Sequence, residues 1–303
     1  MAKPKILVIV GPTASGKSSL AVKLAEKFNG EIISADSRQV YIGLDIGTGK
    51  ITKREMGGVP HHLLDVTSPN QIFTVSDYER LARQAVIEIT ARGRLPIISG
   101  GTGFYLQALT NPINLPAVKP NLKLRRELEK LPTQKLFEQL KKFDPTRAAK
   151  IDSQNRRRLI RALEIARALG QVPTLAPQSP LAGSVLKLGL TVEKEKLKEK
   201  INTRLAKRLK QGLIAEVRKL HARGLSWQRL DDLGLEYRYL GLYLQNKLTK
   251  EELTTTLQTA IWHYARRQIS WFKRDRQIRW LNWTKPDFPT AARLVRDFVR
   301  KNK

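Results

Sequence analysis

The sequence predicts an α/β fold in which helices flank a parallel sheet and a helical domain is inserted between two strands. Two short apolar runs, 6–10 and 95–99, are each followed by a glycine-rich turn and a helical pattern, the order expected of strands in such a sheet. Helical patterns alone fill 121–169, and a strand pattern resumes at 185–192. A chain of 303 residues can bury one such core and carry a second, smaller domain.

The turn after the first run has the spacing of a phosphate-binding loop. Gly11, Gly16, Lys17 and Ser18 match the pattern Gly-x-x-x-x-Gly-Lys-Ser/Thr. Glycines let the backbone turn tightly and aim its amides at an anion, and the helix that follows adds partial positive charge at its N-terminus. The lysine would contact the phosphates, and Ser18 would offer its hydroxyl to magnesium. The motif therefore predicts a P-loop NTPase-like sheet that binds phosphate groups.

Two other strand ends carry polar residues that we expect at the same edge of the sheet. Asp36 follows a short strand pattern at 31–34, and Thr102 lies in the turn after 95–99. Ligands of open α/β sheets bind at the carboxyl ends of the strands, so Asp36 is expected to face whatever the loop holds. The glycines around Thr102 have a second reading, in which they only permit close packing of a helix on a strand.

Between these strands the patterns are less specific. Glycines and a proline in 41–60 predict a long mobile connection, and 61–66 has the pattern of another strand edge. His61 and His62 have no metal-like partner spacing nearby, so we expect them to have a structural role. A helix is predicted from 76 to 92.

Proline-containing segments divide the chain into two parts. Prolines among small residues in 111–120 mark a boundary, and the uncharged segment 171–184 is expected to return the chain to the sheet. We therefore predict a core from 1–120 and 181–303 and a helical insertion domain from 121–180.

One helix of the insertion domain has a basic face. On a helix, Arg157 and Arg161 share that face and Arg158 lies beside them. The opposite stripe is apolar and consists of Leu159, Leu163 and Ala166. A helix with one buried face and one guanidinium face suits the binding of a sugar-phosphate backbone.

The net charge is strongly positive and unevenly distributed. The chain has 56 Lys and Arg against 27 Asp and Glu, a formal charge of +29. Residues 1–110 hold 13 basic and 9 acidic side chains, whereas 111–303 hold 43 and 18, a net of +25. This surplus favours nucleic acid as a partner over an anionic membrane or a merely solvated surface. Cysteine is absent, which excludes disulfides, and no apolar run reaches the length of a membrane span, so a cytoplasmic protein is expected.

The last third of the chain is helical and basic. Long helices are predicted at 194–223, with a break near Gly212, and at 249–273, and a final strand at 278–281. The second helix carries Arg266 and Arg267, and aromatic residues are interleaved with basic ones around them. That pattern suits nucleic-acid contact, although the tryptophans also fit core positions.

The residues alone leave three chemical readings open. In a small-molecule kinase, a nucleotide would occupy the loop and Asp36 would orient an acceptor hydroxyl, but the positive surplus would have no use. In a second interpretation, the loop holds a diphosphate that is the leaving group of the reaction, rather than a nucleotide that donates a phosphoryl group. In a third, a nucleic-acid-dependent ATPase or a binding module explains the charge but gives Asp36 and Thr102 no role.

A series of longer motifs extends over nearly the whole chain. They are Gly-Pro-Thr-Ala-Ser-Gly-Lys-Ser at 11–18, Ser-Ala-Asp-Ser-Arg-Gln-Val-Tyr at 34–41, Leu-Asp-Ile-Gly-Thr at 44–48, Pro-His-His-Leu-Leu-Asp at 60–65, Gly-Gly-Thr-Gly-Phe-Tyr at 100–105, Arg-Ala-Leu-Glu at 161–164, Gly-Leu-Ile-Ala-Glu-Val at 212–217 and Arg-Arg-Gln-Ile-Ser-Trp-Phe at 266–272. In these motifs and their order the chain closely resembles the tRNA dimethylallyltransferases, also called tRNA isopentenyltransferases or IPP transferases.

This resemblance implies transfer of a dimethylallyl group from dimethylallyl diphosphate to the exocyclic amine of the adenosine on the 3′ side of the anticodon in tRNA. It implies that Asp36 accepts a proton from the amine, that Thr102 is a second hydrogen-bond partner, and that magnesium on Ser18 shares the charge of the diphosphate. The implied diphosphate-binding residues are Gly11, Thr13, Ala14, Ser15, Gly16, Lys17, Ser18 and Arg204. The implied contacts to the tRNA anticodon stem-loop are Ser37, Arg38, Gln39, Lys123, Arg157, Arg158, Arg161, Tyr237, Arg238, Arg266 and Arg267.

The chain departs from the family's pattern at two places. Lys123, with Arg125 nearby, stands where the family usually has an arginine, and 233–238 differs from the family's usual Ile-Gly-Tyr form. Adenylate isopentenyltransferases, which modify free nucleotides, are the close rival, and the positive surplus argues against them because a mononucleotide needs only a few cations. We expect the protein to act as a monomer.

Overall fold

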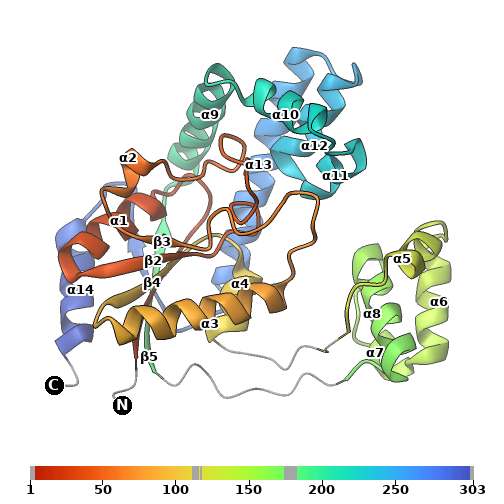
Figure 1. Ribbon diagram of the computed structural model, residues 1–303, viewed down its shortest axis with the longest axis horizontal. Helices are drawn as coiled ribbons and strands as arrows, with labels where there is room; N and C mark the ends of the chain where they lie inside the picture. The colour runs from red at the N-terminus through yellow and green to blue at the C-terminus, as the bar shows by residue number, and fades with distance from the viewer. Residues whose placement is uncertain (1–3, 111–115, 117, 174–182, 301–303) are drawn as a thin grey trace. The chain divides into compact units, whose positions relative to one another are not determined.

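Six parallel strands form one sheet in the part of the chain that the computed structural model describes, which is residues 4–110, 116, 118–173 and 183–300 (Figure 1). The strands are β1 (Lys5–Val10), β2 (Gly30–Ser34), β3 (His61–His62), β4 (Leu95–Ser99), β5 (Ser184–Thr191) and β6 (Ile278–Asn282). Their order in the sheet is β3-β2-β4-β1-β5-β6, with every neighbouring pair parallel. The predicted parallel α/β fold is confirmed.

Helices cover both faces of this sheet. The helices are α1 (Lys17–Phe28) and α14 (Phe288–Arg300) on one face, and α3 (Val75–Ala91) and α4 (Gly103–Thr110) on the other. Alternate residues of β1 enter the two cores: Leu7 and Ile9 pack with α1 and α14, whereas Ile6 and Val8 pack with α3 and α4. Burial on both faces explains why this strand reads as a continuous apolar run.

A third group of helices packs on the segment that follows β2. The group consists of α9 (Lys194–Lys210), α10 (Leu213–Ala222), α11 (Trp227–Leu233), α12 (Leu235–Leu244) and α13 (Lys250–Phe272). Its buried core includes Val40 and Leu44 from that segment. The predicted break in the first long helix lies at Gly212, which has a φ of 98° between α9 and α10. The sequence did not predict α11, α12 or the short α2 (Lys53–Met56).

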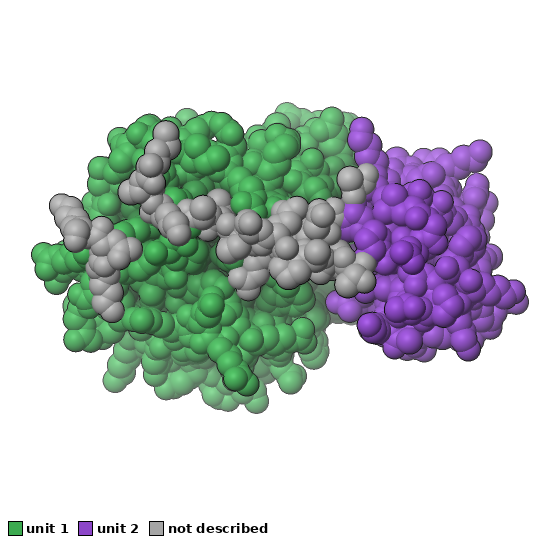
Figure 2. Space-filling view, turned by 90° about the horizontal axis from the view of Figure 1, so that it is seen from below, with its two compact units in different colours: residues 1–111, 179–303 green, residues 112–178 purple. Residues whose placement is uncertain are grey.

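The chain divides into two compact units, residues 1–111 with 179–303 and residues 112–178 (Figure 2). The second unit contains α5 (Leu122–Glu129), α6 (Thr133–Phe143), α7 (Pro145–Ala148) and α8 (Arg156–Leu169), which surround a core of their own. Much of the expected boundary segments, 111–115, 117 and 174–182, lies outside the described residues. Among the described helices, none is both long and apolar enough to cross a membrane.

Glu31 links β2 to the end of α3 through a buried ion-pair cluster. Its carboxylate, 3% exposed, accepts hydrogen bonds from Arg92 (2.7 Å) and Arg94 (3.0 Å) and pairs with Nε2 of His62 (2.6 Å). Burial raises the pKa of Glu31, but the hydrogen bonds from Arg92 and His62 outweigh burial and lower that pKa to about 2. His62 therefore has a structural partner, and His61 is bonded to a backbone carbonyl.

Candidate phosphate and acceptor site

The loop between β1 and α1 has the conformation that its motif requires. Gly16, at the N-terminus of α1, has a φ of 93°, a left-handed conformation that favours glycine. The ammonium of Lys17 folds back onto the loop and donates to the carbonyl oxygen of Pro12 (2.7 Å). Ser18 is exposed in the first turn of α1, and the hydroxyl of buried Ser15 has no hydrogen-bond partner among the described residues. Backbone amides, an ammonium and hydroxyls thus meet at the start of a helix, an arrangement that binds phosphate.

Asp36 and Thr102 lie side by side at the ends of neighbouring strands. The backbone N–H of Thr102 donates to the carbonyl oxygen of Ala35 (3.1 Å), and its Oγ1 accepts from the N–H of Ser37 (3.0 Å). Oδ1 of Asp36 accepts from the backbone N–H of Arg38 (2.8 Å). No hydrogen bond to its Oδ2 is found among the described residues, and Asp36 is only half-buried.

The phosphate loop and Asp36 lie at the same edge of the sheet. Ser99 of β4 is in register with Ile9 of β1 and with Ser34 of β2. Because the strands are parallel, the segments that follow them emerge together, two strand spacings or about 10 Å apart. A diphosphate on the loop and a five-carbon chain can bridge that distance to a group held by Asp36.

Gln268 joins the loop to the turn after β4, a role that the sequence did not predict. Its Oε1 accepts from the N–H of Thr13 (2.8 Å), and its Nε2 donates to the carbonyl oxygen of Gly101 (2.9 Å). The side chain is 6% exposed, and a Cβ on Gly101 would lie 2.1 Å from its Nε2. Gln268 belongs to one of the quoted motifs, but its exposed basic neighbours gave that motif its nucleic-acid interpretation.

Three cations from two helices, Lys17 of α1 and Arg204 and Arg208 of α9, form a connected group that begins at the loop. Burial and repulsion from Arg204 lower the pKa of Lys17 to about 7, although the charge of Asp36 opposes this shift. Burial and repulsion from Arg208 likewise lower the pKa of Arg204 to about 10. Arg208 pairs with Glu236 (3.0 Å), whose own pKa is raised by burial. Partly desolvated, mutually repelling cations of this kind are expected where a polyanionic ligand binds.

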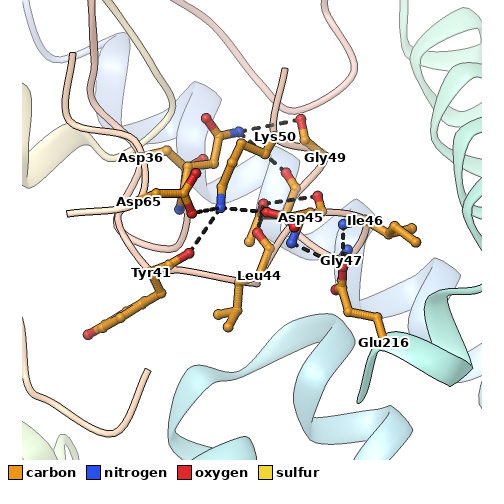
Figure 3. Close-up of polar contacts among 12 residues, drawn as sticks. Asp36, Tyr41, Leu44, Asp45, Ile46, Gly47, Gly49, Lys50, Asp65 and Glu216 are labelled. Atoms are coloured by element: carbon orange, nitrogen blue, oxygen red, sulfur yellow. Dashed lines mark hydrogen bonds and ion pairs between the residues drawn. The ribbon is translucent and has the colours of Figure 1, made fainter. Parts of the chain in front are cut away.

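The connection 41–50 is held on several sides, although the sequence predicted a mobile one (Figure 3). Lys50 lies between the carboxylates of Asp45 and Asp65 and also donates to the carbonyl oxygen of Tyr41. On the other side, Glu216 of α10 accepts hydrogen bonds from consecutive backbone amides of the connection. The connection therefore forms a fixed wall beside the cations.

In the first unit, the residues expected to contact tRNA differ in their exposure and in whether they already bind other parts of the protein. Arg266 and Arg267 are exposed on α13. Arg38 donates from Nε to the carbonyl oxygen of Leu233 (2.6 Å), and Arg238 pairs with Asp231 (2.6 Å). The other expected residues here are Ser37, Gln39 and Tyr237. Ser37 and Gln39 are half-buried beside Asp36.

Tyr237 requires a correction. It is 1% exposed, and its hydroxyl donates to Oε1 of Glu216 (3.0 Å). In this structure the side chain is part of the helical core and is not available for direct contact with RNA.

In the second unit, the predicted basic face of α8 is only partly free. Arg157 and Arg158 are exposed, as is Lys123 on α5. Arg161 is instead paired with Glu164, a carboxylate 1% exposed that also binds Arg125 (2.8 Å). Arg161 therefore stabilises the unit, since a buried carboxylate needs a cationic partner.

The profile of a protein family described as IPP transferase matches residues 39–275. The tRNA dimethylallyltransferase of Halalkalibacterium halodurans is 40% identical over 98% of this chain and 97% of its own length. The tRNA dimethylallyltransferase 2 of Trichlorobacter lovleyi is 43% identical over 96% of each chain.

Two solved structures resemble the fold along nearly its full length. The full-length tRNA isopentenylpyrophosphate transferase of Bacillus halodurans matches with a TM-score of 0.73 at 39% identity, covering 98% of this chain and 96% of that one. A eukaryotic dimethylallyltransferase acting on tRNA matches with a TM-score of 0.82 at 26% identity, covering 99% of this chain and 80% of that one.

The lowered pKa of Lys17 predicts proton uptake when a diphosphate binds. With a pKa of about 7, only about one tenth of the Lys17 side chains are charged at pH 8, and a bound polyanion restores the charge. Affinity for dimethylallyl diphosphate, measured without tRNA, should therefore fall by up to about tenfold per pH unit between about pH 7.5 and 9. Calorimetry at pH 8 in buffers of different ionisation enthalpy should show nearly one proton taken up.

The Lys17→Arg variant is the control, because a guanidinium stays charged throughout this range. Equal proton uptake by the variant and the unmodified protein would contradict the assignment to Lys17.

Proposed function

Because the chain belongs to the IPP transferase family, we propose that it transfers a dimethylallyl group from dimethylallyl diphosphate to the exocyclic amine of an adenosine in tRNA. In this proposal the phosphate loop binds the donor and Asp36 binds the acceptor amine. The acceptor is the adenosine on the 3′ side of the anticodon. One observation carries the assignment of the site. Three adjacent strands, β1, β4 and β2, end at one sheet edge in the phosphate loop, Thr102 and Asp36, respectively. The loop and Asp36 are therefore about two strand spacings apart.

The donor half of the site is suited to a departing diphosphate. As the allylic carbon–oxygen bond breaks, its electron pair stays on the diphosphate, which gains negative charge. The amides of 13–18, Lys17 and Arg204 would stabilise that charge. Their cationic groups are already partly desolvated, so their interaction with the leaving group is strengthened and needs less reorganisation.

The acceptor half positions and deprotonates the amine. The nitrogen forms the new bond to the allylic carbon and loses one proton, which Asp36 would accept on its free Oδ2. Thr102 keeps the backbone around Asp36 in place through its bond from Ser37, and it would be a second hydrogen-bond partner of the amine. The adenine must leave the stack of the anticodon loop to reach this edge, at a cost of a few kcal/mol.

Magnesium fits the loop through Ser18. The described residues contain no group of three or more His, Cys, Asp or Glu side chains that could hold a metal ion. Magnesium needs no such group, because it often binds one protein oxygen, substrate phosphates and water. The exposed hydroxyl of Ser18 at the start of α1 supplies that oxygen. When bound there, the ion would share the charge of the diphosphate.

The kinase and free-adenylate readings are less well supported, because the relatives described above are named for action on tRNA. The test is incubation with radiolabelled dimethylallyl diphosphate and either tRNA or AMP. We expect label in tRNA, at the adenosine that follows the anticodon, and none in AMP. Label in AMP alone would exclude the proposed acceptor.

Asp36→Asn should greatly lower the rate of dimethylallyl transfer without loss of RNA binding, because the amide of asparagine cannot accept the proton. We expect the single-turnover rate to fall by about 100- to 10,000-fold and the Kd for tRNA to change by less than about twofold. Asp297→Asn, which removes an exposed carboxylate from α14, is the matched control. Near-normal chemistry in Asp36→Asn would rule out this residue as the base.

The exposed arginines Arg157 and Arg158 of α8 are proposed to contact the tRNA backbone. Replacing both Arg157 and Arg158 by alanine should weaken tRNA binding and reduce the slope of log Kd against log salt by about 1 to 2. Arg167→Ala, at the exposed far end of the same helix, should leave that slope unchanged. A slope unaltered in the double variant would place these arginines on a solvated face that RNA does not touch.

A further inference from the structure

We propose that Glu216 is a positioning residue for donor binding, which fixes connection 45–49 so that the carbonyl oxygen of Gly49 holds Arg204 toward the diphosphate. The inference rests on the proposed function, in which Arg204 binds the donor. Glu216 itself lies in α10 and would act only through the connection. Its contacts with the connection are drawn in Figure 3.

The amide side of the connection is bound to one carboxylate. Oε2 of Glu216 accepts from the N–H of Asp45 (3.1 Å) and of Ile46 (2.6 Å), and Oε1 accepts from the N–H of Gly47 (3.0 Å). Three successive amides that converge on one anion form a nest, a geometry in which a full negative charge is well satisfied. Oε1 also accepts from the buried hydroxyl of Tyr237 (3.0 Å), which fixes the carboxylate itself.

The carbonyl side of the same connection is bound to the arginines. Gly47 accepts from Nη1 of Arg208 (3.1 Å), and Gly49 accepts from Nη2 of Arg204 (3.3 Å). A Cβ on Gly49 would lie 1.8 Å from Nη2 of Arg208 and 2.2 Å from Nη2 of Arg204. The connection therefore fits against both guanidiniums without space for even a methyl group, and a shift of its backbone would displace them.

The arginines need this support because they repel each other. Arg208 contributes to the lowering of the pKa of Arg204; Arg208 is buried and Arg204 is half-buried. Without fixed acceptors, the two guanidiniums would gain by moving apart. A fixed backbone therefore preorganises Arg204 for the anion, which reduces the cost of ordering it on binding.

The test compares Glu216→Gln with Gly49→Ala, and uses Glu199→Gln on the exposed face of α9 as the matched control. Glutamine keeps the shape but turns an amide N–H toward backbone donors, whereas Gly49→Ala pushes on the arginines and leaves Glu216 in place. For both variants we expect the Kd for dimethylallyl diphosphate, measured without tRNA, to rise about tenfold, roughly the loss of one charge-assisted hydrogen bond. The KM for tRNA should change by less than about twofold, and Glu199→Gln should change neither.

A double-mutant cycle with Arg204→Ala separates positioning from general stability. If Glu216 acts through Arg204, the double variant should bind the donor no more weakly than Arg204→Ala alone. The inference would be overturned if the two substitutions caused additive losses in the free energy of donor binding. It would also be overturned if the Glu216→Gln protein bound the donor normally. Normal donor binding by Arg204→Ala would instead overturn the proposed role of that arginine, so the two failures are distinguishable.

Discussion

The spacing between the phosphate loop and Asp36 is the constraint on which the site depends, and buried hydrogen bonds maintain it. Gln268 ties the N–H of Thr13 to the carbonyl oxygen of Gly101, and Thr102 then bonds to the backbone on both sides of Asp36. These links cross from β1 to β4 and from β4 to β2 at the ends of the strands. In the proposed function, these bonds would hold the two substrates in line, which is where an enzyme that joins two substrates gains most.

Most of the fold could be predicted because its strands are short apolar runs between glycine turns and helical patterns. The doubly buried β1 and β4 have unambiguous patterns of this kind, whereas β3 has only two residues and the predicted strand edge was longer. The helices α11 and α12 were missed because they are short and separated only by Gly234. They are stabilised by packing in the third helical core rather than by a strong local pattern.

In the candidate site, too, features set by local sequence could be predicted, and contacts between distant parts of the chain could not. The loop motif and Asp36 could be predicted because spacing within one segment determines their placement. Gln268 and Glu216 could not, because the backbone groups that they bind lie at least 167 positions away along the chain. The positive charge of the helix pattern was also misleading for one arginine, Arg161, which was expected to contact tRNA. Arg161 is used to neutralise the buried carboxylate of Glu164, and a count of basic residues cannot distinguish such internal pairs from free ones.

The pair formed by Arg204 and Arg208 has a practical consequence for work on the isolated protein. Two partly desolvated guanidiniums that repel each other will attract any small multivalent anion, whether or not it carries a prenyl chain. Sulfate and phosphate buffers should therefore act as competitors of the donor while also raising the melting temperature. Assays in chloride-based buffer would avoid both effects.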